Sequence, residues 1–539
     1  MELVSQHVKG IMEECKRRAR AAGLRFSDET LEYIVTNRDL LELAPKVMIP
    51  TLYDYWVHDV EVLKEQGKYK LYPTNPYETV INSRPAISFY NDNNPDWLNV
   101  MIFYHVLAHI DFFQNNVLFK NTWNDDFVGQ ALADKRLIAN LRSEYGRWVD
   151  YVIEFARSID NITGYFAEVA EREYAGILDP SDRLAFYFGE FLQEIVKLPT
   201  TDYCKEVARY NDLLDEKGDD SAEETFFAEV RERYPEFQAK WERRQRQQAH
   251  ERPFRDLLQF VHDRSPFLRK EENQWMRAVL QIVRNTALYF QPQIRTKILN
   301  EGWASYWHEE LFLRDERIIG HESDYAKVNA GVTAISRVGL NPYAIGLRLI
   351  REVEERAERG ILSWRFQRLT DSAAREAFNE KTGKGKEAIF MLRSFFSDFM
   401  LINTFVDQDF VDRYNLFVVG KRLDEKRGVW QYYIKSRKAE DYKQMLLDHL
   451  YHPPVITVDE EHTSDKCLAL IHQFEGKQLV KEFIPDVLVG LEFLWGGSVT
   501  LETTEIVVKK PETDGAEQQR EYRRVRYRCA DRKVSREEI

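Results

Sequence analysis

Residues 99–116 read NVMIFYHVLAHIDFFQNN, an apolar run of helical character that contains two histidines. His105 and His109 are four residues apart, so their imidazoles project from the same face of a helix. Two imidazoles placed in this way can bind one metal ion. The stretch therefore predicts a helix of the protein core that carries half of a metal site.

A second helix is expected at residues 296–312, TKILNEGWASYWHEELF, and it supplies a candidate for the third ligand. Glu301 is followed by the small residues Gly302 and Ala304, which permit another helix to approach closely. His308 lies two turns beyond Glu301 on nearly the same side. We therefore predict a metal site formed by His105, His109 and Glu301.

Two histidines and one glutamate leave a ligand position open for water, which is typical of catalytic rather than structural zinc sites. The pattern resembles the gluzincin metallopeptidases. In those enzymes the glutamate of an HExxH motif is the general base, and the matching position here is Val106. The resemblance thus implies a metal site that lacks the usual peptidase base.

Two simpler interpretations of the same residues stay open at this stage. His105 and His109 would then be ordinary core histidines, as an isolated HxxxH pattern often is. Glu301 would form a surface ion pair with Arg295 or Lys297, which stabilises a protein by no more than about 1 kcal/mol.

Other polar residues near the two motifs are candidates for supporting roles. Asp111 and His308 are candidates either for ligands or for groups that orient ligands. Because one helix cannot point residues 105, 109 and 111 at one spot, we expect Asp111 to orient the ligands, as we do for Asn115 and His308. Catalytic roles are predicted for Glu301, His308 and Tyr306. The phenols of Tyr306 and Tyr104 are candidate donors to a metal-bound oxyanion.

Composition argues against several other classes of protein. The chain has 76 basic and 89 acidic residues, a net charge of -13, and no coherent basic face, so nucleic acid is not an expected partner. The N-terminus does not resemble a signal peptide, and no apolar run approaches the roughly 20 residues of a membrane span. Four widely separated cysteines fit a reducing compartment. We expect a cytoplasmic protein.

Apolar spacing predicts a mainly α-helical large domain over residues 1–410, with a zincin-like or gluzincin-like helical body. Helical spacing is read at Leu31, Ile34 and Val35, and again at Met276, Val279, Leu280 and Val283. Residues 75–94 are expected to form a loop or short strand before a helix that begins near Pro95.

A densely charged stretch at residues 215–252 predicts a solvated helical insertion or linker, and its run Arg243 to Arg246 is a weaker candidate for binding an acidic partner. Residues 411–510 predict a smaller α+β domain with elements in the order ββαββαβ. The charged tail at residues 511–539 is expected to fray.

Four segments together resemble the SpoVR family, named for stage V sporulation protein R. They are YHVLAHIDFFQNN at 104–116, PQIRTKILNEGWASYWH at 292–308, SRVGLNPYAIGLRL at 336–349 and LINTFVDQDFVDRYNLF at 401–417. The resemblance implies a role in sporulation, in spore cortex formation or in a stress response. It also implies a PrkA-type serine protein kinase and a von Willebrand A-type protein as partners.

The sequence thus leads to two hypotheses about function. The first is a metal-dependent hydrolase that binds zinc, or iron or manganese, and acts on a peptide or a cell-wall precursor. The second is a non-catalytic scaffold or regulator, a former peptidase whose α+β domain recruits a kinase.

Overall fold

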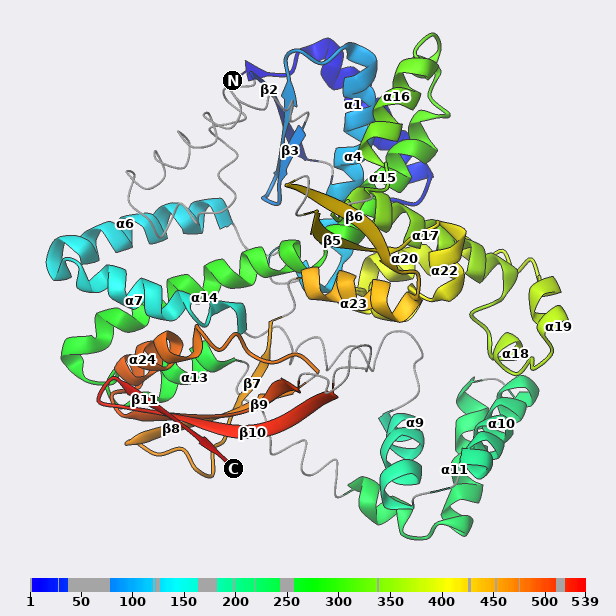
Figure 1. The fold of residues 1–539 in the computed structure, drawn as a ribbon. Coiled ribbons are helices and arrows are strands. Elements are labelled where there is room, and N and C mark those ends of the chain that lie inside the picture. Colours follow the sequence, from blue (N-terminus) through cyan, green and yellow to red (C-terminus); the bar gives the residue numbers. More distant parts are fainter. Residues whose placement is uncertain are drawn as a thin grey trace. The chain divides into compact units, whose positions relative to one another are not determined.

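The structure of the protein is a computed structural model, drawn as a ribbon in Figure 1. It describes residues 2–27, 29–36, 78–119, 122, 127–162, 182–196, 198, 200–217, 219–242, 256–336, 339–424, 428–450, 453–474, 476–509 and 519–539. Most of these residues are helical, and strands follow towards the C-terminus. The prediction of a mainly α-helical body followed by a smaller α+β region is confirmed.

Two buried helices form the centre of the helical body. In α4 (Asp96–Asn115) every residue from Val100 to Phe113 is buried, and in α15 (Lys297–Phe312) every residue from Ile298 to His308 is buried. Helices that are apolar on all sides belong inside a core. The expected start near Pro95 is confirmed, since Pro95 is the N-cap of α4.

On its other side α15 packs against α17 (Pro342–Arg359), and two glycines set the distance between these helices. A Cβ atom added to Gly302 would lie 2.5 Å from the Cα of Gly346, closer than real Cβ contacts occur. The two backbones therefore touch. The close helix approach predicted at Gly302 is confirmed, and its partner is α17.

The first turn of α15 is held by a carboxylate from another helix. Asp398, the first residue of α21 (Asp398–Phe405), accepts hydrogen bonds of 2.8 Å from the backbone N–H groups of Ile298 and Leu299. These two amides have no partner within their own helix. Burial raises the pKa of Asp398 to about 7, although the two amides act in the opposite direction.

Further helices and one hairpin complete the helical body, in which α1 packs against α4 and α20 against α17. The helices are α1 (Gln6–Ala21), α16 (Glu322–Val332), α18 (Trp364–Gln367), α19 (Ser372–Ala377), α20 (Gly385–Phe395), α22 (Gln408–Arg413) and α23 (Ala439–His449), and the hairpin pairs β5 (Val418–Asp424) with β6 (Val429–Ser436). Short 3₁₀ turns lie at Val117–Phe119, Asp160–Ile162, Glu271–Asn273 and Glu316–Ile318.

A four-stranded sheet lies near the N-terminus, in the order β1 (Glu2–Leu3), β2 (Thr30–Val35), β4 (Ala86–Asn91) and β3 (Glu78–Ile81). The helix read from Leu31, Ile34 and Val35 is wrong, because these residues belong to β2. β2 pairs in parallel with β4, and this pairing outweighs the helical spacing of three side chains. The short strand expected within residues 75–94 is confirmed by β3 and β4.

The C-terminal region contains a five-stranded sheet in the order β11-β10-β9-β8-β7. Its strands are β7 (Val455–Val458), β8 (Cys467–Gln473), β9 (Ser498–Lys509), β10 (Gln519–Ala530) and β11 (Lys533–Glu538). Helix α24 (Ile484–Trp495) packs on the sheet and on α7 (Trp148–Arg157), as Figure 1 shows. Helix α14 (Gln274–Arg295) contacts α7, α6 (Phe127–Tyr145) and α13 (Leu257–Arg264). From β5 to β9 the elements follow the expected order ββαββαβ.

The expectation that the tail frays is wrong for residues 519–538, which form β10 and β11. Val525, Tyr527 and Cys529 are buried in alternation along β10, as in a strand with one covered face. At alternate positions, Arg524 and Arg526 form ion pairs with Glu502 on β9. The arginines mask this alternation in the sequence.

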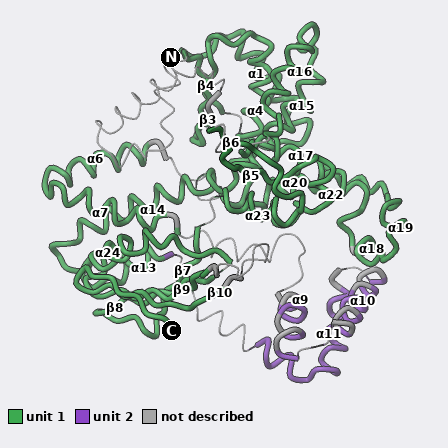
Figure 2. The backbone as a smooth tube through the Cα atoms, in the orientation of Figure 1, with its two compact units in different colours: residues 1–163, 257–539 green, residues 164–256 purple. Residues whose placement is uncertain are grey.

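Two compact units are coloured in Figure 2: residues 1–163 with 257–539, and residues 164–256. This division differs from the expected boundary near residue 410. The second unit contains α9 (Asp182–Ala185), a π-helix at Phe186–Ile195, α10 (Thr200–Lys217) and α11 (Asp219–Arg233). Most of the described part of the charged stretch is helical, and it contributes Phe226 and Phe227 to an aromatic core. Arg243 to Arg246 lie outside the described residues.

In the part of the chain that the structure describes, no helix is both long and apolar enough to cross a membrane. The three cysteines whose side chains are described there, Cys15, Cys467 and Cys529, are free thiols.

Candidate metal centre

The three predicted metal ligands meet where α4 and α15 pack together. One ligand atom of each of His105, His109 and Glu301 lies within 4.8 Å of the others, and all three residues are buried. Nε2 of His109 is 3.5 Å from Oε2 of Glu301, and Nε2 of His105 is 3.9 Å from the same oxygen. The two motifs, almost 200 residues apart in sequence, thus form one cluster.

These distances suit a common metal ion. In a tetrahedral zinc site with bonds of about 2.0–2.1 Å, neighbouring ligand atoms are about 3.3 Å apart, slightly less than the separations here. Oε2 of Glu301 is buried and accepts no hydrogen bond from a described residue. A buried carboxylate oxygen without a hydrogen bond is unfavourable unless a cation is beside it. The residues therefore fit a divalent ion.

The orientation of His109 is set by Asn300, the residue before Glu301. Nδ1 of His109 lies 2.9 Å from Oδ1 of Asn300. A carboxamide oxygen only accepts, so Nδ1 carries the proton and Nε2 presents its lone pair towards Glu301. This is the tautomer that a metal ligand needs, because the coordinating nitrogen must be unprotonated.

His105 is oriented by a longer chain of hydrogen bonds. Nε2 of His308 lies 3.0 Å from Oδ1 of Asn329 on α16 and donates to it. Nδ1 of His308 is therefore an acceptor, and it lies 2.9 Å from Nδ1 of His105, which donates. Nε2 of His105 then has its lone pair on the side of Glu301. His308 thus contacts one of the predicted ligands, and its role in orienting that ligand stays a prediction.

Electrostatics keeps His105 and His308 neutral. Burial lowers the pKa of His105 well below its usual value, and the neighbouring His109 and His308 lower it further. Burial likewise lowers the pKa of His308 to about 4. Neutral imidazoles are the form that binds a metal ion near pH 7.

Lys297 lies on the solvent side of the cluster. Its ammonium group is 3.1 Å from Oε1 of Glu301, and its side chain is more than half exposed. The alternative ion pair proposed from the sequence is therefore present with Lys297. It uses Oε1 only, so Oε2 of Glu301 still faces the histidines. Gln291, rather than Glu301, accepts a hydrogen bond from Arg295.

Asp111 and Asn115 do not contact the histidines, contrary to their expected role in orienting the ligands. Asp111 accepts hydrogen bonds from the backbone N–H of Arg25 and the indole N–H of Trp303, and it lies 3.5 Å from Nε of Arg393. Burial raises its pKa to about 6. Asn115 donates to the backbone carbonyl oxygens of Arg25 and Asp111. Their side of α4 packs against other elements.

The two tyrosines considered as oxyanion donors are also bonded elsewhere. The phenol of Tyr306 donates to the carboxylate of Glu354 on α17, at 2.8–2.9 Å. The phenol of Tyr104 donates to Asp315 at 2.7 Å. Neither hydroxyl group faces the metal cluster in this structure.

Sequence reasoning missed Asn300 and Asn329. The sequence does offer a signal for Asn300, because it directly precedes Glu301 and therefore lies at the same end of α15 as this predicted ligand. No pattern marks Asn329, since its place depends on how α16 packs on α15.

The fold and the cluster together define a helical protein with a buried His/His/Glu group of the kind that binds divalent metals. The chain belongs to the SpoVR family, since the family model described as "SpoVR like protein" matches residues 2–452. The match ends just before β7, so the five-stranded sheet lies outside it. A relative is the uncharacterized protein YcgB of Escherichia coli (strain K12), 23% identical over 494 residues, which are 87% of this chain and 86% of that protein. No solved structure matches the chain, and the likeness to gluzincins stays a prediction.

Proposed function

We propose that this protein is a metal-dependent hydrolase whose ion is held by His105, His109 and Glu301. The observation that carries the proposal is the convergence of two imidazole nitrogens and one carboxylate oxygen at a buried point. The hydrogen bonds that His109 donates to Asn300 and His105 donates to His308 support it, because they set both ligand histidines in the tautomer that coordinates.

Zinc is the first choice of ion, with iron or manganese as alternatives, and such an ion supplies a Lewis acid and a bound water that ionises near neutral pH. The chain's own part is to hold three ligand atoms and, by burying His105, to keep that imidazole neutral. We propose a peptide or a cell-wall precursor as the substrate, because hydrolysis of an amide or ester bond is the chemistry that a site with one open position suits.

A second candidate function is a scaffold without catalysis. Val106, fully buried, occupies the position of the glutamate base of HExxH peptidases. In this alternative the metal stabilises the packing of α4 against α15. The partners expected from the family resemblance, a PrkA-type kinase and a von Willebrand A-type protein, are part of this alternative.

The test is the metal content of protein purified without an affinity tag, measured by elemental mass spectrometry. We expect about one equivalent of metal in the wild type and little in His105→Ala and Glu301→Gln. His462→Ala is the matched control, because His462 is exposed and lies in the C-terminal region. A folded wild-type protein that holds no metal, even after zinc, iron or manganese is added back, would exclude both forms of the metal site.

Complementation of a deletion strain separates the hydrolase from the scaffold. Glu301→Gln keeps the size of the side chain, so its fold can be checked by circular dichroism. A folded Glu301→Gln variant that fails to complement a deletion strain supports the hydrolase. Full complementation by a folded, metal-free variant supports the scaffold.

A further inference from the structure

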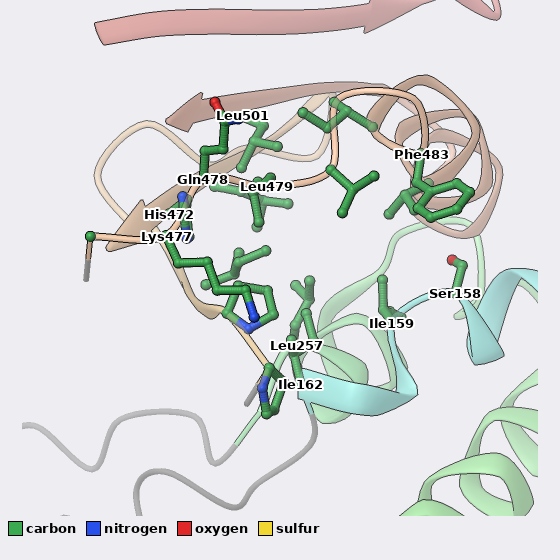
Figure 3. A pocket seen from close by; sticks show the side chains of 18 of the residues that line it. Ser158, Ile159, Ile162, Leu257, His472, Lys477, Gln478, Leu479, Phe483 and Leu501 are labelled. Atoms are coloured by element: carbon green, nitrogen blue, oxygen red, sulfur yellow. The ribbon is translucent and has the colours of Figure 1, made fainter. Parts of the chain in front are cut away.

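A large cavity lies in the C-terminal region, among residues that the metal centre does not use. Its volume is about 590 Å³, within the range of about 300–1,000 Å³ that is usual for sites of small molecules. Figure 3 shows that side chains from the sheet, from the loop before α24 and from residues 158–162 point into the same space. Helices α13 and α24, and α21 and α23 of the helical body, contribute further parts of the wall.

Most of the lining is aliphatic. Representative residues, each from a different segment of the chain, are Ile159, Leu257, Leu470, Leu479, Leu491 and Leu501. Phe399 and Phe483 are the aromatic residues of the lining. Flat ring systems are usually bound by stacking on aromatic side chains, whereas a flexible hydrocarbon chain needs apolar surface. The lining therefore suits an aliphatic ligand.

Two charged side chains of the lining, Asp448 and Lys477, differ in their hydrogen bonds to other residues. Asp448 accepts a hydrogen bond of 2.8 Å from Nε2 of Gln444. Lys477 is exposed at the cavity, and its ammonium group forms no hydrogen bond or ion pair with a residue that the structure describes. An anionic group of a ligand would find its counter-ion there.

A buried histidine adds a fixed polar group to the same wall. His472 on β8 is 6% exposed, and its Nδ1 lies 2.8 Å from Oγ1 of Thr503 on β9. This hydrogen bond fixes the imidazole ring in the wall of the cavity, on the side labelled with Lys477 and Gln478 in Figure 3. Apolar walls with a few polar groups on one side are typical of sites for amphipathic molecules.

We propose that this cavity binds an aliphatic carboxylic acid. The hydrocarbon chain lies among the leucine and isoleucine side chains, and the carboxylate lies at Lys477. This binding site is separate from the metal centre, and it does not depend on whether a metal is bound there.

The test is isothermal titration calorimetry of the full chain with decanoate, decanol and decylamine, which share a chain and differ in the head group. We expect one site per chain, with decanoate bound most tightly and decylamine most weakly. Lys477→Gln should weaken decanoate about two- to fivefold, the range for an ion pair that water reaches, and leave decanol unchanged. Lys327→Gln on α16, an exposed lysine outside the cavity, is the matched control.

Whether the ligand lies inside the cavity is tested by substitutions that fill it with a larger side chain. Val487→Phe places a larger side chain in the lining and should weaken decanoate and decanol more than tenfold. Leu479→Phe, on the loop before α24, is a second variant in case the first does not fold, and circular dichroism checks both. The proposal is overturned if folded wild type binds none of the probes, if a folded filling variant binds decanoate normally, or if decylamine binds more tightly than decanoate.

Discussion

The contact between Gly302 and Gly346 gives the sharpest test of how α15 is held. In Gly302→Ala the new methyl group would lie 2.5 Å from the Cα of Gly346, and ordinary contact begins at 3.4 Å. The helices must therefore separate by about 1 Å. The obstacle is backbone, which has no rotamer to change, so α15 itself has to move.

The expected cost follows from two opposing effects. Overpacking of a core costs about 1–3 kcal/mol, and the rigidity of the backbone contact places this variant near the upper end. Alanine favours a helix over glycine by up to about 1 kcal/mol. We expect a net loss of about 2 kcal/mol in the free energy of unfolding. A shift of about 1 Å at Glu301 is also large beside the scatter of metal–ligand bond lengths, about 0.2 Å, so metal content should fall as well.

The assay is thermal denaturation followed by circular dichroism, with metal content measured on the same samples. Gly10→Ala is the matched control, because Gly10 lies inside α1 and a Cβ atom there would meet nothing within 4 Å. That variant should melt at or slightly above the wild-type temperature. The reasoning is refuted if Gly302→Ala melts as high as Gly10→Ala.

Three further variants test the support of the metal centre and the C-terminal sheet. Asn329→Ala removes the acceptor that fixes the histidine chain, so metal affinity measured by competition with a chelator should fall about 10- to 100-fold while the fold is kept. Asp398→Ala leaves two amides at the start of α15 without an acceptor and should lower stability towards urea by about 1–3 kcal/mol. Hydrogen bonds, above all those from Arg536, lower the pKa of Glu505 to about 2. The ionised carboxylate therefore stabilises the fold at pH values above 4.5, the usual pKa of the group, and this contribution is lost as the pH falls from 4.5 towards 2. Glu505→Gln should therefore be less stable than the wild type by about 2 kcal/mol at pH 7, and urea denaturation at a series of pH values should show the gap closing by pH 2.

Local periodicity explains why much of the helical body was predictable. A spacing of four residues places His105 and His109 on one face of any α-helix, whatever surrounds it. Gly302 has only a hydrogen atom as its side chain, so the sequence alone likewise predicts a close approach of another helix there. Such features depend on the geometry of one helix, which neighbouring residues largely determine.

Predictions from local periodicity were wrong where the pairing of distant segments decides the structure. Residues 30–35 have helical spacing yet form β2, since β4 offers a partner strand. Residues 519–530 are dense in arginine yet form β10, because β9 provides acidic partners and the buried positions alternate. Neither partner can be recognised from the segment itself.

For the metal centre, the sequence by itself determined the chemistry of the ligands and the family of the chain. It supplied a histidine pair on one helix and a glutamate on another. Only the tertiary structure decided that these residues meet within 4.8 Å, that Asn300 and His308 hold the histidines, and that Asp111 contacts Trp303 and Arg393 instead. The physical reason is that a helix fixes which side chains share a face, whereas the packing of helices far apart in the chain fixes what that face meets.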